Sequence, residues 1–183
     1  ASFEKVDNTG IEMFSGWWES VSAADMDNDG DVDFVAGNIG KNNLFQPTAE
    51  QPVTVIAKDF DQNGSIDPVT FAYFKDKTGV FKSFPVHFWG DINKQSTLFR
   101  SKFNYYRDYA KATENTLFTN SELENAMILK GNYDKSAYIE NLGNGSFKMH
   151  PLPIEAQLAP LNSTILKDIN SDGNLDILGV GND

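Results

Sequence analysis

The early part of the chain contains the stretch Asp25-Met26-Asp27-Asn28-Asp29-Gly30-Asp31-Val32-Asp33. The same pattern returns as DFDQNGSID at residues 59–67 and as DINSDGNLD at residues 168–176. All three follow D-x-[DN]-x-[DN]-G-x-x-D, which places side-chain oxygens at positions 1, 3, 5 and 9 and glycine at position 6. A hard cation such as calcium requires several converging oxygens, and glycine allows the sharp turn between them. The sequence therefore predicts three calcium-binding loops.

The EF-hand is the obvious alternative, because its loop shares the first six positions. An EF-hand also needs a bidentate glutamate at position 12. That position holds Ala36, Thr70 and Gly179 in the three loops, so the EF-hand interpretation fails three times. The flanking residues are β-branched and other apolar types interrupted by glycine, which favours strands over helices. We expect each loop to connect two short strands.

Composition indicates a folded, acidic protein. Its 183 residues are 40% hydrophobic and 13% aromatic, which is enough for a sizeable core. No apolar run approaches 18 residues, so no membrane-spanning helix is expected. The net charge is −11, and the loops hold eleven of the 26 acidic residues, leaving 15 to match the 15 basic ones. The acidity therefore belongs to the loops, and without a basic stripe a nucleic-acid partner is not expected.

Signals for catalysis are weak. The chain has no cysteine, which excludes disulfides and thiolate chemistry, and it has two histidines, His87 and His150, for which ordinary packing is expected. No glycine-rich phosphate loop, nucleophile elbow or histidine-based metal motif is present. The tandem Trp17-Trp18 has two interpretations, packing with a partly exposed ring or a stacking platform for sugar rings.

These features resemble the FG-GAP or VCBS repeat of integrin-α-like β-propellers, and of long repeat-containing surface proteins of Bacteroidetes. The resemblance rests on the loop motif within residues 22–38, on a second copy within residues 55–67, and on residues 137–183. In the last range, residues 138–147 resemble the F-x-N-x-G-x-G-x-F hairpin of these repeats. Residues 91–132 match no propeller repeat. The resemblance implies an exported, extracellular, cell-surface or periplasmic protein with up to three structural Ca²⁺ ions.

The resemblance also implies ligands for each ion. In each loop, four side chains and one backbone carbonyl would bind calcium. The first set is Asp25, Asp27, Asp29 and Asp33 with the carbonyl of Asp31; the second is Asp59, Asp61, Asn63 and Asp67 with the carbonyl of Ser65; the third is Asp168, Asn170, Asp172 and Asp176 with the carbonyl of Asn174. Magnesium fits less well, because it prefers small octahedral shells and retains its waters.

The expected fold is mainly β, with about three propeller-type blades in a single unit, residues 1–183. The first two loops start 34 residues apart, the length of four short strands with turns, which predicts one blade per repeat. Closed propellers need roughly four to eight blades, so we expect a partial propeller or a segment of a larger one. Open blade edges would then favour self-association.

A helical hairpin is predicted as an insertion at residues 91–132. Its first helix would place Leu98, Phe99, Phe103, Tyr106 and Ala110 on one stripe. A capping-box pattern at residues 121–124, followed by the apolar residues 126–129, predicts a second helix. The insertion would cover a blade edge or contact a neighbouring module, or it would form a ligand-binding lid.

Two kinds of function are consistent with these features, a binding module and part of an enzyme. The first is a calcium-binding, non-catalytic propeller module that mediates adhesion, protein interaction or glycan recognition, with a protein or carbohydrate ligand. The second is part of a polysaccharide-active enzyme, such as a lyase built on a calcium-containing propeller.

Overall fold

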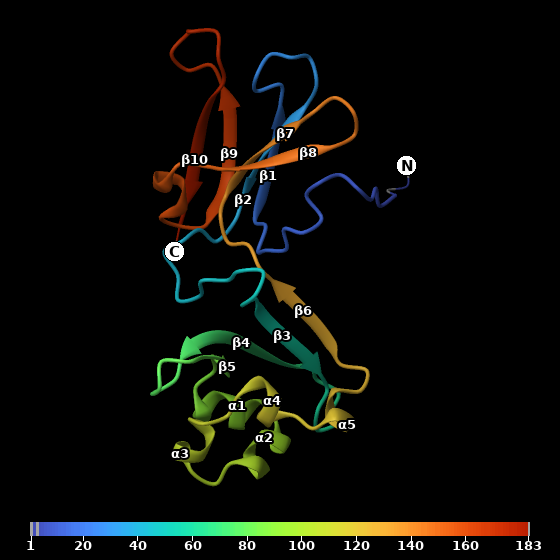
Figure 1. The fold of residues 1–183 in the computed structure, drawn as a ribbon, viewed down its shortest axis with the longest axis vertical. Coiled ribbons are helices and arrows are strands. Elements are labelled where there is room, and N and C mark those ends of the chain that lie inside the picture. The colour runs from blue at the N-terminus through green and yellow to red at the C-terminus, as the bar shows by residue number, and fades with distance from the viewer. Residues whose placement is uncertain (1, 3, 183) are drawn as a thin grey trace. The chain divides into compact units, whose positions relative to one another are not determined.

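The computed structural model describes residue 2 and residues 4–182. In this part of the chain it has ten strands, all in antiparallel sheets, with five short α-helices and one 3-10 turn (Figure 1). The predicted mainly β class is confirmed. Among the described residues, no helix has the length and apolar character needed to cross a bilayer.

The chain divides into two compact units, and the second is inserted into the first along the sequence. The first unit comprises the residues up to Gln46 and those from Tyr133 onward. The second unit is Pro47–Asn132, which contains the helices and also the second acidic loop.

Strands dominate the first unit. A four-stranded sheet has the order β1-β2-β7-β8, and β9 and β10 form a separate two-stranded sheet. The elements are β1 (Ser20–Ala24), β2 (Asp33–Gly37), β7 (Ala137–Asn141), β8 (Phe147–Pro151), η1 (Ile154–Gln157), β9 (Leu161–Lys167) and β10 (Asp176–Gly181). Val35, Leu152 and Leu161 form its buried apolar cluster. The Ser22 hydroxyl on β1 donates to the backbone oxygen of Thr164 on β9 at 2.9 Å.

Helices pack on a sheet in the second unit, whose four strands have the order β5-β4-β3-β6. The elements are β3 (Val53–Lys58), β4 (Asp67–Lys75), β5 (Phe81–Pro85), α1 (Trp89–Gln95), α2 (Thr97–Lys102), α3 (Tyr106–Tyr109), α4 (Glu114–Leu117), α5 (Asn120–Leu123) and β6 (Met127–Gly131). Ile56, Val69 and Phe71 of the sheet pack with Phe99 and Leu117 of the helical layer. This larger core stabilises the unit because it removes aromatic and aliphatic surface from water.

Helices do lie in the predicted insertion, but as five short helices, α1 to α5, and not as a two-helix hairpin. The first stripe does not form one helix, because the backbone is extended at Phe103 and Tyr105 and separates α2 from α3. The predicted second helix ends early, since Asn125 has a left-handed φ of 60°. Residues 127–131 then form β6, in which Ile128 pairs with Ile56 of β3. A short apolar run is compatible with a strand or a helix. Residues 127–131 form a strand here because they pair with the edge of β3.

The 34 residues from the start of the first loop to the start of the second do not form one four-stranded sheet. After β2, the next strand of the same sheet is β7, which comes after the entire inserted unit. The β3 strand begins a different sheet. The distance between the first two loops therefore measures where the insertion begins and does not measure the length of a blade.

The insertion leaves the first unit's sheet continuous. Ala36 of β2 pairs with Ala137 of β7, although the second unit separates them in sequence. Just beyond these strands, the Gly40 N–H donates to the Asp134 carbonyl at 2.7 Å. Both ends of the inserted unit are also paired, since Val53 lies opposite Gly131. Entry and exit are thus adjacent in each unit.

This connection predicts that the inserted unit can be removed. Replacing residues 47–132 by a six-residue Gly-Ser linker, whose average span is about 14 Å, is expected to leave the first unit folded. The measurement is a ¹H–¹⁵N spectrum of the shortened chain, with dispersed signals that match those of the full chain for β1, β2, β7 and β8. A collapsed spectrum would show that the first unit needs the insertion to fold.

Candidate metal sites

The three acidic loops occupy equivalent places in three antiparallel hairpins. They connect β1 to β2, β3 to β4 and β9 to β10. In every hairpin, the residue before loop position 1 pairs with the aspartate at position 9. These pairs are Ala24 with Asp33, Lys58 with Asp67, and Lys167 with Asp176. The predicted strand–loop–strand arrangement is confirmed, and the three copies share one register.

The loops also share their internal hydrogen bonds. The position 9 carboxylate accepts the N–H of position 2, from Met26 to Asp33 at 3.0 Å, Phe60 to Asp67 at 3.1 Å, and Ile169 to Asp176 at 2.9 Å. The glycine N–H at position 6 donates to the carboxylate of position 1, from Gly30 to Asp25 at 3.1 Å, Gly64 to Asp59 at 2.8 Å, and Gly173 to Asp168 at 3.0 Å. These glycines have φ of 97°, 89° and 90°, a region that other residues rarely adopt.

A third repeated bond involves the predicted carbonyl ligands. The residue at position 7 donates its N–H to the side chain at position 5, from Asp31 to Asp29 at 3.0 Å, Ser65 to Asn63 at 2.8 Å, and Asn174 to Asp172 at 2.8 Å. The backbone at position 7 is therefore held against the side chain of another predicted ligand in every loop.

The first loop gathers three carboxylates. Oxygens of Asp25, Asp27 and Asp29 lie within 4.8 Å of one another. One oxygen of Asp25 and one of Asp31 are buried without a hydrogen-bond partner among the described residues. Loss of surrounding water and repulsion by neighbouring carboxylates raise the pKa of Asp27 and Asp31. A divalent cation would satisfy these oxygens and remove the repulsion.

Asp33, the last residue of the first loop, is directed elsewhere. Its Oδ1 accepts the Asn141 N–H at 2.8 Å, and its Oδ2 accepts the Tyr138 hydroxyl at 3.0 Å. The Asn141 side chain also donates to the backbone oxygen of Val32 at 3.1 Å. The structure thus uses Asp33 to attach the loop to β7 and does not group it with the other three. Tyr138 and Asn141 both lie in the hairpin motif noted in the sequence, but nothing in the sequence indicated their contacts with Asp33.

The second loop gathers a different set of three. Oxygens of Asp59, Asp61 and Asp67 lie within 4.8 Å of one another, and the Asp61 Oδ1 is buried without a partner among the described residues. Burial raises the pKa of Asp67, since water no longer stabilises its charge. Asn63 at position 5 is exposed, and its oxygen accepts the N–H at position 7.

Thr97, at the start of α2, holds one of these carboxylates. Its N–H and its hydroxyl donate to the Asp61 Oδ2 at 2.8 and 3.0 Å. The N–H bond lowers the pKa of Asp61 and keeps it charged. With Oδ2 fixed in this way, the unpartnered Oδ1 remains for a cation. Sequence reasoning missed Thr97, because the contact spans 36 residues of chain.

The third loop is self-contained. Within the described part of the chain, its carboxylates do not form such a group of three. Asp172 accepts the Asn174 N–H, which lowers the pKa of Asp172, and its other oxygen accepts the Asn170 side-chain amide at 3.1 Å. Asp168 accepts the N–H groups of Ser171 and Gly173. The loop's own donors therefore satisfy carboxylates that a cation would need.

The two histidines and the tandem tryptophan have packing contacts. The His87 Nε2 accepts the Thr70 N–H at 3.0 Å, and burial lowers the pKa of His87. His150 lies 2.6 Å from a carboxylate oxygen of Glu140. Trp18 is 38% exposed and stacks on Tyr133 with 5.9 Å between ring centroids.

Comparisons of the chain with protein-family models, with curated proteins and with solved structures find no match. The metal assignment therefore depends on the geometry of the loops.

The contact between Thr97 and Asp61 predicts that α2 increases the calcium affinity of the second loop. Thr97→Ala removes one of two hydrogen bonds to Asp61, a loss of about 1 kcal/mol, and is expected to weaken one calcium-binding event about fivefold in calorimetry. Thr78→Ala is the matched control, because Thr78 makes the same pair of bonds to Asp76 outside the loops. Equal effects of the two substitutions would contradict a role for Thr97 in the site.

Proposed function

We propose that the chain is a calcium-stabilised, non-catalytic segment of a β-propeller from an exported bacterial protein, which mediates adhesion through protein or glycan interactions. The observation that carries this proposal is the threefold use of one hairpin, with the same register and the same hydrogen bonds. The buried, unpartnered carboxylate oxygens of the first two loops support a bound cation. Resemblance of the motif to FG-GAP and VCBS repeats supports the propeller.

Calcium has a structural role in this proposal. Extracellular calcium modules bind with dissociation constants of about 10⁻⁴–10⁻³ M. At millimolar calcium, each site then adds roughly 0.4–1.4 kcal/mol to the free energy of unfolding. The sites of the first two loops together would contribute about 1–3 kcal/mol, a sizeable share of the ~5–15 kcal/mol of a typical domain.

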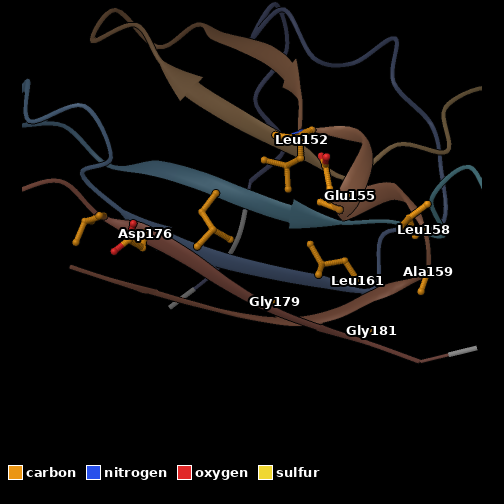
Figure 2. Close-up of a pocket in the computed structure, with 12 residues that line it drawn as sticks. Leu152, Glu155, Leu158, Ala159, Leu161, Asp176, Gly179 and Gly181 are labelled. Carbon is orange, nitrogen blue, oxygen red and sulfur yellow. The ribbon is translucent and has the colours of Figure 1, made fainter. Parts of the chain in front are cut away.

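The strand arrangement fits incomplete blades. Each unit holds one four-stranded antiparallel sheet, which is the strand number of a propeller blade. The β9–β10 hairpin contains only two strands, and an apolar hollow of about 540 Å³ lies against it. Figure 2 shows Leu152, Leu161 and Gly179 among the residues that line this hollow.

The free edge of β10 is the expected contact with a second copy of the chain. After the first loop, β2 pairs with β1 and with β7; after the second loop, β4 pairs with β3 and with β5. After the third loop, β10 pairs with β9, and its other edge has no partner strand among the described residues. An unpaired edge offers backbone donors and acceptors to another strand. We expect a strand from a second copy to use this edge.

Calcium removal is expected to lower the melting temperature by several degrees, because each lost kcal/mol corresponds to about 2–4 °C for a chain of this size. Thermal unfolding followed by circular dichroism, with calcium and then with excess chelator, measures the shift. Equal molar magnesium is expected to restore only part of it.

Asp29→Ala serves as the matched variant, because Asp29 belongs to the first group of three carboxylates. It is expected to remove one calcium ion from the calorimetric count and to reduce the calcium-dependent shift. Asp7→Ala, an exposed aspartate outside the loops, is the control. An unchanged melting temperature on chelation, or an unchanged ion count in Asp29→Ala, would refute structural calcium at the first loop.

Self-association through β10 predicts different effects from two matched substitutions. Leu178 of β10 and Ile165 of β9 are paired neighbours with exposed fractions of 53% and 58%. Leu178→Lys places a charge on the edge strand and is expected to shift the protein toward monomer in sedimentation velocity. Ile165→Lys changes the same face on β9, whose Thr164 backbone oxygen already accepts the Ser22 hydroxyl of β1, and is expected to leave association unchanged. Monomeric wild-type protein at all concentrations would overturn this contact.

A further inference from the structure

A polar hollow of about 530 Å³ lies in the second unit, away from the acidic loops. Its size falls within the range of about 300–1,000 Å³ typical of small-molecule sites. The lining residues are Tyr73 of β4, then Phe81, Lys82 and Ser83 of β5, and Lys111, Thr113, Glu114, Asn115 and Thr116 at and before α4. This combination of aromatic, hydroxyl, amide and charged groups differs from that of the apolar hollow beside β10.

The floor of the hollow is a continuation of the buried sheet face. Side chains alternate along a strand, so Tyr73 lies on the same face of β4 as the buried Val69 and Phe71. Tyr73 pairs across the sheet with Ser83, and Lys75 pairs with Phe81. The hollow is therefore the part of this face that the helical layer leaves open. There Phe81 is 46% exposed, and the Lys75 ammonium lies over its ring, 5.3 Å from the ring centroid.

The wall of the hollow is held in place before any ligand binds. The Ser83 hydroxyl donates to a carboxylate oxygen of Glu114 at 2.7 Å, which joins β5 to α4. Thr113 and Thr116 form a capping box that fixes the first turn of α4. A preformed site costs less ordering on binding than a flexible one.

Three polar side chains in the hollow remain free. The Tyr73 hydroxyl, the Lys111 ammonium and the Asn115 amide have no hydrogen-bond or ion-pair partner among the described residues. Lys82, by contrast, pairs with Asp76 at 2.8 Å. The hollow thus offers the unpaired Lys111 ammonium, two uncommitted polar groups and the part of the Phe81 surface that Lys75 leaves exposed.

We propose that this hollow binds an acidic sugar, of the uronic acid type, within a glycan. The apolar C–H face of a sugar ring packs on an aromatic side chain such as Phe81. Sugar hydroxyls both donate and accept hydrogen bonds, as do the Tyr73 hydroxyl and the Asn115 amide. Lys111 pairs with the single carboxylate of the sugar. This assignment rests on the proposed glycan-binding function and names its ligand class.

The test uses two disaccharides that differ in one group, cellobiouronic acid and cellobiose. Each is titrated into the ¹⁵N-labelled full chain in saturating calcium and followed by ¹H–¹⁵N spectra. We expect cellobiouronic acid to shift the signals of residues 73, 81–83 and 111–116, with at least tenfold tighter binding than cellobiose. Lys111→Gln is expected to remove that difference, and Phe81→Ala to weaken both ligands about tenfold.

Lys94→Gln is the control for charge, because Lys94 is an exposed lysine on α1 that does not line the hollow. It is expected to bind like the unchanged chain. No shift with cellobiouronic acid, shifts confined to the acidic loops, or equal affinity for both sugars would overturn the proposal. Melting in calcium and in chelator, measured on the same samples, reports separately on structural calcium, so failure of sugar binding and failure of the calcium role are distinguishable.

Discussion

The bond between the second and ninth residues of each acidic turn is the constraint on which the hairpins depend. The carboxylate at position 9 accepts the N–H at position 2, which closes the turn where the two strands begin to pair. The oxygens of the intervening residues are then gathered within the turn, beside the strand ends. The same bond therefore sets the place of the candidate ligands in every loop.

The three turns share this closure, but their surroundings differ. Tyr138 and Asn141 of β7 hold the first loop, Thr97 of α2 holds the second, and the third relies on its own amides. Buried carboxylate oxygens lack partners only in the first two loops, within the described residues. The three loops thus share one local shape but differ in the residues that hold them and in whether a buried oxygen remains for a cation.

Local features of the fold could be predicted from the sequence. The spacing of oxygens and glycine predicted the loops and the strands beside them, because a nine-residue turn contains its own hydrogen bonds. The pairing of β2 with β7 could not be predicted, since nothing near Ala36 identifies a partner at Ala137. The strand β6 was mistaken for a helix, because four apolar residues fit either structure until an open sheet edge is known. Thr97 and Tyr138 were missed for the same reason, as their role depends on a distant partner.

The neighbouring entry and exit of the inserted unit have a mechanical consequence. Tension applied along a polypeptide is carried by its backbone and by the hydrogen bonds that pair its strands. In this chain, tension that arrives through β2 passes across its hydrogen bonds to β7 and continues from there. While those hydrogen bonds are intact, little force would reach the second unit. It would bear force only after β2 and β7 separate.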